Sequence, residues 1–134
     1  MAVAYDAGST SGYESNPSWT HTPSGTPRGV VVWTVSASGD NCSNVTYGGV
    51  SMTEVTGSPN NKSSGEGIRV QCFFLGSGLG TGAKTVSVTQ STGAVGYAVT
   101  LTASADTEIN DTDTVASDSV SNPRASLVLG GVSS

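Results

Sequence analysis

Apolar and polar residues alternate along most of this chain in short runs separated by glycine, proline, serine and asparagine. Alternation with a period of two predicts β-strands that bury one face. No stretch combines strong helix formers with the apolar spacing of an amphipathic helix. The runs that predict strands are "AVAYDA" (2–7), "SWTHT" (18–22), "VVVWTVSA" (30–37), "VTY" (45–47), "VSMTEV" (50–55), "IRVQCFFLG" (68–76), "KTVSVTQ" (84–90), "AVGYAVTLTAS" (94–104) and "ASLVLGG" (125–131).

Two of these runs make specific predictions about burial. The run at 30–37 is apolar almost throughout, which predicts a central strand buried on both faces. The run at 68–76 alternates more strictly and predicts a half-buried strand. Its apolar face consists of Ile68, Val70, Cys72 and Phe74. We therefore expect Cys72 to be a buried thiol.

Glycines mark the expected turns. Gly48 and Gly49 separate the predicted strands at 45–47 and 50–55, and glycine adopts positive φ at little steric cost. This dipeptide predicts a tight hairpin or a bulged corner. The segment "STG" (91–93) joins the runs at 84–90 and 94–104, which predicts a second hairpin.

Polar segments lie between the strands. We expect an exposed tip at 56–67, a glycine turn at 77–83, and an acidic loop at 105–119 with a short strand near Val115. Eight to ten short strands at regular spacing predict an all-β fold, an antiparallel two-sheet β-sandwich of jelly-roll-like type. Residues 1–134 are expected to form one domain, with 1–17 as an N-terminal strand or arm. The strand pattern persists close to the last residue, as in a truncated or naturally short family member.

Charge excludes several classes of partner. Only 11% of the 134 residues are charged, and the formal net charge is −5. Nucleic acids and anionic membranes bind clustered cations, whereas the basic residues here are isolated. They are Arg28, Lys62, Arg69, Lys84 and Arg124. No apolar run reaches the roughly 18–20 residues of a membrane helix, and "MAVAYDAG" (1–8) lacks the pattern of a secretory signal.

Residues capable of catalysis do not form a recognisable constellation. His21 is the single histidine and shares a strand face with Trp19, which is typical of core or interface positions. The acidic residues outside 105–119 are isolated. "SGLGTG" (77–82) has neither the lysine nor the following helix of a nucleotide phosphate loop and predicts a turn. We therefore expect a protein that is not an enzyme.

Candidate binding residues are few. Asp106, Asp111 and Asp113 offer the oxygen ligands that Ca²⁺ prefers, but the glycine and closing glutamate of a calcium loop are missing. A solvated acidic loop is the preferred interpretation, with no metal and no cofactor. Tyr13 and Tyr47 are the tyrosines expected to be exposed and able to stack on sugars.

The two cysteines, Cys42 and Cys72, fall in different contexts. Cys42 lies in a polar loop, and Cys72 lies in a strand. Two separate thiols are therefore the preferred interpretation, with a disulfide between them as the alternative.

Several segments resemble a known group of proteins when taken together. They are "SWTHTPSGTPRGVVVWTVSAS" (18–38), "VTYGGVSMTEV" (45–55), "IRVQCFFLGSGLGTGAKTVSVT" (68–89) and "AVGYAVTLTAS" (94–104). They resemble the Gly/Ser/Thr-rich β-sandwich proteins of bacteriophage structural-gene regions and of some bacterial surface proteins. The resemblance implies a structural role in a virion or at a surface and supplies no catalytic residue.

Two functions follow as expectations. The first is a capsid decoration (cement) or fibre-associated subunit on the virion surface, which assembles with copies of itself and with a capsid or tail protein. Closed cyclic oligomers are common, and a trimer is expected, with Val3, Tyr5 and Trp19 as interface candidates. The alternative is a carbohydrate-binding module of a larger extracellular or cell-surface protein, in which Tyr13 and Tyr47 stack on sugar rings.

Overall fold

The computed structural model describes residues 3–36, 40–55, 60–61, 67–104, 107–114 and 125–131, and of these the segments 60–61, 107–114 and 125–131 are described by their backbone alone. No helix within these ranges is long and apolar enough to cross a membrane. The strands are β1 (Ala4–Thr10), β2 (Ser18–His21), β3 (Gly29–Ser36), β4 (Asn44–Tyr47), β5 (Val50–Ser51), β6 (Thr53–Glu54), β7 (Asn60–Asn61), β8 (Arg69–Leu75), β9 (Lys84–Thr89), β10 (Ala94–Thr102), β11 (Thr107–Thr114) and β12 (Ala125–Gly131).

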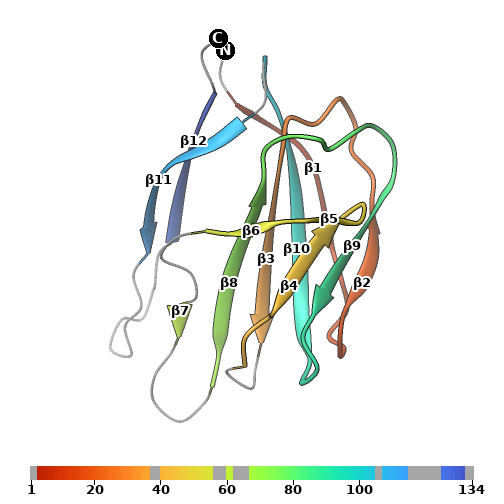
Figure 1. Cartoon of the computed structure of the whole chain (residues 1–134), viewed down its shortest axis with the longest axis vertical. Coiled ribbons are helices and arrows are strands. Elements are labelled where there is room, and N and C mark those ends of the chain that lie inside the picture. Colours follow the sequence, from red (N-terminus) through yellow and green to blue (C-terminus); the bar gives the residue numbers. More distant parts are fainter. Residues whose placement is uncertain are drawn as a thin grey trace.

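Two antiparallel sheets form the body of the protein (Figure 1). The larger sheet has the order β1-β10-β3-β8-β6, and β7 also pairs with β8. The smaller sheet has the order β2-β9-β4-β5, and β11 pairs with β12 in a separate two-stranded sheet. The predicted all-β, antiparallel two-sheet sandwich is therefore confirmed.

The main core lies between the two sheets. Its largest cluster takes Val30, Val32, Phe73 and Ala98 from the larger sheet and Val45, Tyr47, Val86 and Val88 from the smaller one. The run at 30–37 supplies the central strand β3, in which Val30, Val31 and Val32 are at most 2% exposed. Consecutive side chains of a strand point to opposite faces, so β3 is buried on both faces in this part, as predicted.

The hairpin predicted at the diglycine is present. β4 pairs with β5, and both Gly48 and Gly49 have positive φ, at 58° and 83°. Two positive φ angles are typical of a type I′ turn, which suits the twist of a two-residue hairpin. The run at 50–55 then divides at Met52, whose side chain is buried in the core. β5 therefore belongs to the smaller sheet and β6 to the larger one.

The second predicted hairpin is wrong. β9 pairs with β2 and β4 in the smaller sheet, whereas β10 pairs with β1 and β3 in the larger sheet. The turn at 91–93 therefore crosses from one sheet to the other. The two strands meet across the core because each has an apolar face, with Val86 and Val88 on one and Ala94 and Ala98 on the other, all at most 2% exposed.

The acidic loop predicted at 105–119 is also wrong in its central part, because Thr107–Thr114 forms β11. This strand is rich in β-branched residues, which favour extended backbone even between acidic neighbours. Together with the division of 50–55 and the two-residue β7, it raises the number of strands above the predicted eight to ten. The strand expected near Val115 and most of the tip at 56–67 lie outside the described residues.

Candidate functional site

The face of the larger sheet that points away from the smaller sheet is apolar across four strands. The register aligns Val70, Val35 and Val95 in one row, Cys72, Trp33 and Tyr97 in the next, and Phe74, Val31 and Val99 in a third. Leu101 and Tyr5 form a further pair at the β1 edge. We call this set, with Gly8 and Thr10 of β1, the outer face. None of its residues is charged.

Burial varies along the outer face. Val31, Val55 and Phe74 form a second small apolar cluster and are less than 10% exposed. Toward the other end, Val35 and Val70 are 42% and 37% exposed, and Tyr97 is 45% exposed. Soluble proteins tolerate single exposed apolar side chains, but a contiguous exposed group is typical of interaction sites.

The structure corrects the expected orientation of β8. The face that carries Cys72 belongs to the outer face, while Gln71 and Phe73 point into the sandwich core. Gln71 is tolerated there because its side chain is hydrogen-bonded. Its Oε1 accepts the backbone N–H of Cys42 at 2.6 Å, and its Nε2 donates to Glu54 Oε1 at 3.1 Å. A polar side chain with these partners can occupy a core position.

Aromatic side chains gather on the outer face near β1. The rings of Trp33 and Tyr97 have centroids 6.3 Å apart and are inclined by 39°. A Cβ atom at Gly8 would lie 2.9 Å from Tyr97 Oη and 3.2 Å from Tyr5 Oη, so both hydroxyls converge on this glycine. Tyr5 is 68% exposed, the largest exposure among the large apolar side chains of the described residues. Tyr97 and Trp33 are register partners on β10 and β3, and Tyr5 of β1 reaches toward them from the position opposite Leu101.

The interface candidates from the sequence are dispersed. Tyr5 lies on the outer face and Val3 is half-buried just before β1. Trp19 faces the interior of the sandwich, where its ring packs against the main core and over Gly96. The sequence pattern did not single out Val35, Val70 or Tyr97, because the alternation in β3, β8 and β10 does not indicate which face meets the second sheet.

Of the two tyrosines predicted to be exposed, Tyr13 is exposed and Tyr47 is not. Tyr13 is 60% exposed beside Gly93. The prediction for Tyr47 is wrong because its ring fills the core between the sheets, where it is 1% exposed and its hydroxyl has no hydrogen-bond partner among the described residues. Burial and the charge of Asp6 raise the pKa of Tyr47 to about 12.

A chain of hydrogen bonds around His21 joins the two sheets. Trp19 Nε1 donates to Ser9 Oγ at 2.9 Å, and Ser9 Oγ lies 2.7 Å from His21 Nδ1. On the other side of the ring, His21 Nε2 lies 3.0 Å from Thr100 Oγ1, which donates to Asp6 Oδ2 at 2.9 Å. Asp6 Oδ1 also accepts the backbone N–H of Gly25 at 2.8 Å.

The directions of these hydrogen bonds determine the protonation state of the His21 ring. The single proton of Thr100 Oγ1 goes to Asp6, so His21 Nε2 must carry a proton and donate it to Thr100. Because Trp19 supplies a donor to Ser9, the Ser9 hydroxyl is free to donate to an unprotonated Nδ1. Every polar group of the ring is therefore satisfied when His21 is neutral. His21 is fully buried, so this network holds β1, β2 and β10 together without presenting a base to solvent.

We expect the protein to lose stability below pH 6.5. Burial lowers the pKa of His21 from its ordinary value of 6.5, and the charge of Asp6 opposes this shift only in part. As the pH falls, the unfolded chain therefore takes up a proton at His21 before the folded chain does. The contribution of neutral His21 to the free energy of unfolding is complete above pH 6.5 and falls as the pH drops toward the folded-state pKa. Urea unfolding at pH 7.5 and pH 5.5 measures the difference.

The chain has one histidine, so a variant without it shows which part of the change belongs to this side chain. A His21→Gln variant should show no such change between the two pH values. An equal change in the variant would contradict the assignment to His21.

The two cysteines lie on opposite faces of the larger sheet and are free thiols, as preferred from the sequence. Cys42 packs in the main core with its Sγ 3.2 Å from Thr34 Oγ1, while Cys72 belongs to the outer face. Burial raises the pKa of both thiols, that of Cys72 to about 12. Neither cysteine has the lowered pKa that makes a thiol reactive.

The calcium candidates Asp106, Asp111 and Asp113 have side chains outside the described part of the structure. Asp111 and Asp113 lie on β11 at register positions opposite Val128 and Ser126. Among the described side chains, no group of three or more His, Cys, Asp or Glu residues is placed to hold a metal ion.

Comparisons with protein-family models, with curated proteins and with solved structures give no match for this chain.

Proposed function

We propose that this protein is a non-enzymatic structural subunit of a bacteriophage particle, of the capsid decoration or fibre-associated type, which acts by assembling through its outer face. The observation that carries the proposal is the uncharged apolar surface across β1, β10, β3 and β8, in which Val35, Val70 and Tyr97 remain exposed. The sequence resemblance to phage β-sandwich proteins supports the virion context.

In this proposal, the partner that binds to the outer face is a second copy of the same chain. Each copy carries a formal charge of −5, so two copies repel one another when charged surfaces approach. The outer face is uncharged, and two such faces meet without pairing like charges. Two sheets can then pack face to face at about 10 Å, as they do inside a sandwich. A single flat face that pairs with itself is isologous and produces a two-fold dimer.

The size of the face limits the strength of this contact. Four strands spaced about 4.8 Å apart and about seven residues at about 3.3 Å each span at most about 440 Å². Two such faces bury at most about 900 Å², and less in practice because Val31 and Phe74 are already buried within the chain, whereas a standard stable interface buries about 1,600 Å². Pairing in solution should therefore be weak and concentration-dependent, and a capsid or tail protein would supply the remaining contact in the particle.

The mass of the purified chain in solution tests this proposal. Size-exclusion chromatography with light scattering, run over a concentration series, should give a mass above the 13.3 kDa of one chain that rises with concentration. EDTA should not change it, because the contact needs no metal ion. A trimer at every concentration would support the oligomer expected from the sequence over face pairing. A monomer up to millimolar concentration would contradict self-assembly.

A carbohydrate-binding module is the second candidate function, favoured by one observation. Tyr5, Tyr97 and Trp33 form an aromatic group on the outer face, and the tyrosine rings offer apolar surfaces with polar hydroxyls. Retention of the protein on immobilised polysaccharides measures carbohydrate binding. Tyr97→Ala should abolish retention, while Tyr13→Ala, on another surface, should not. Failure of the wild-type chain to bind any polysaccharide would eliminate this candidate.

A further inference from the structure

The β11–β12 hairpin carries one extra residue in its first strand. Ile109 pairs with Leu129, whereas Asp111 pairs with Val128, so Asn110 forms a β-bulge. Residues of a strand alternate between the two faces of a sheet, and register partners share a face. In a regular strand, Ile109 and Asp111 would therefore share a face. The bulge places them on opposite faces.

This shift separates acidic positions from apolar ones. The register places all three acidic residues of β11 on one face, which we call the acidic hairpin face. It consists of Glu108, Asp111, Asp113, Ser126, Val128 and Gly130. The opposite face, which we call the apolar hairpin face, has no charged residue. It consists of Thr107, Ile109, Thr112, Thr114, Ala125, Leu127, Leu129 and Gly131.

The hairpin needs a partner surface to be stable. β11 and β12 pair with each other, and neither pairs with a described strand of the two larger sheets. In Figure 1 the hairpin stands beside β8 and β7, to the side of the body. An isolated two-stranded hairpin is marginally stable in water and depends on further packing. The apolar hairpin face is the side suited to such packing.

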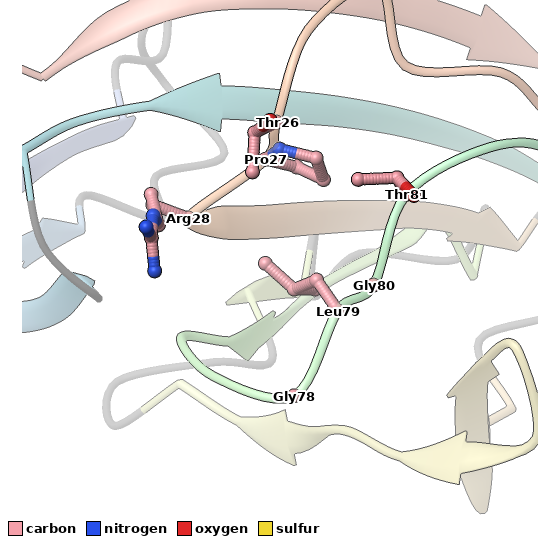
Figure 2. A pocket seen from close by; sticks show the side chains of 7 residues that line it. All are labelled: Thr26, Pro27, Arg28, Gly78, Leu79, Gly80 and Thr81. Atoms are coloured by element: carbon pink, nitrogen blue, oxygen red, sulfur yellow. The ribbon is translucent and has the colours of Figure 1, made fainter.

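The pocket between the segment before β3 and the loop that joins β8 to β9 is not suited to this role. It has a volume of about 290 Å³ and is lined by Thr26, Pro27, Arg28 and residues 78–81 (Figure 2). Its larger apolar side chains, Pro27 and Leu79, are buried, and Arg28 is charged. A face of two strands needs a broad exposed apolar surface, which the outer face provides.

The symmetry of the proposed dimer brings the hairpin to the outer face of the other copy. In a face-to-face dimer whose two-fold axis runs along the strands, the strand order is reversed between the copies. The β8 side of one copy then lies over the β1 side of the other. The hairpin beside β8 therefore reaches the part of the second copy where Tyr5 and Tyr97 are exposed, at 68% and 45% in the single chain.

The hairpin supplies contact area that the outer face alone lacks. Its strands have eight and seven residues, so at about 4.8 Å between strands and about 3.3 Å per residue the apolar hairpin face spans about 240 Å². The hairpins of both copies raise the buried area from at most about 900 Å² to at most about 1,400 Å². This value falls within the range of stable interfaces.

We infer that the β11–β12 hairpin completes the assembly interface, with its apolar hairpin face packed on the outer face of a second copy around Tyr5 and Tyr97. The inference rests on the proposed function, since it takes the second copy as the partner of the outer face. The acidic hairpin face remains in water, where its three carboxylates keep their hydration.

Sedimentation equilibrium of two lysine variants at neighbouring positions of β12 tests the inference. Leu129 and Val128 lie on opposite hairpin faces, and both substitutions change the net charge equally. Leu129→Lys should weaken dimerisation by more than about tenfold, because the lysine would lose its hydration in the contact. Val128→Lys should leave the dissociation constant within about twofold of the wild-type value. Urea unfolding, followed by tryptophan fluorescence, shows whether the body of each variant is folded.

Amide hydrogen exchange of the wild-type chain provides a test that needs no variant. The amides of β11 and β12 should exchange more slowly as the protein concentration rises, because the hairpin is packed only in the dimer. Protection that does not depend on concentration would assign the hairpin to a surface of its own chain and overturn the inference. Rapid exchange at every concentration would also overturn it.

The outcomes separate this inference from the proposed function. If Val35→Lys on the outer face weakens association and Leu129→Lys does not, the hairpin inference fails and the proposed function stands. If Leu129→Lys weakens association and Val35→Lys does not, the hairpins associate without the outer face, which contradicts both. A wild-type chain that stays monomeric at every concentration also contradicts both.

Discussion

Gly96→Ala should lower the free energy of unfolding by about 3 kcal/mol, because the added methyl group has no room. A Cβ atom at this position would lie 2.6 Å from Trp19 Cζ3, well inside van der Waals contact. The indole cannot move away freely, since Trp19 Nε1 donates to Ser9 Oγ in the network around His21. The ring would have to leave the space between β2 and β10. Urea or thermal unfolding measures the effect.

Gly12→Ala is the matched control for this variant. Nothing lies within 4 Å of a Cβ atom at Gly12, and its φ is not positive. The substitution should leave stability unchanged within about 0.5 kcal/mol, or raise it slightly by restricting the unfolded chain. Similar losses in the two variants would show that the Trp19 contact is not the cause.

Thr100→Val should cost about 2–3 kcal/mol, although the two side chains have almost the same shape. The change removes the hydroxyl that accepts from His21 Nε2 and donates to Asp6 Oδ2. His21 is fully buried, so its N–H is left without an acceptor. Loss of one partner in a buried network is costly because the remaining groups stay desolvated. Chemical unfolding at pH 7.5 measures the cost.

Thr20→Val provides the comparison on the neighbouring strand β2. Its side chain is exposed and makes no hydrogen bond to another described residue, so valine should change stability by less than about 0.5 kcal/mol. An equal loss of unfolding free energy in both variants would show that replacing any threonine has this effect. It would contradict a stabilising role of the hydrogen-bond network around His21.

The sequence predicts the strands well because each carries a local signal. β3 has its apolar run, β4 and β5 have their diglycine turn, and β8 has strict alternation. Alternation identifies two faces but not which one meets the second sheet. In β8, the polar Gln71 faces the core because Cys42 and Glu54 satisfy its amide. Those partners are distant in sequence, so the sequence does not indicate which side of β8 belongs to the outer face.

Local sequence patterns also do not indicate which strands belong to the same sheet. β9 and β10 are joined by a short glycine turn, which is typical of hairpins, yet they belong to different sheets. Their separation depends on contacts between remote residues, such as the Trp19 ring over Gly96. The network from Ser9 to Asp6 also joins residues from β1, β2 and β10, and no spacing in the sequence reveals it. Candidate sites made by tertiary contacts are therefore found only in the folded chain.

Sedimentation equilibrium of the wild-type chain beside two lysine variants tests most directly whether the outer face carries assembly. Val35 on the outer face and Val50 on β5 of the smaller sheet are matched in exposure, at 42% and 45%. The wild-type chain and Val50→Lys should associate alike, whereas Val35→Lys should remain at 13.3 kDa, because a charge in an apolar contact is left desolvated and unpaired. A folded Val35→Lys variant that associates as strongly as the wild-type chain would contradict the account.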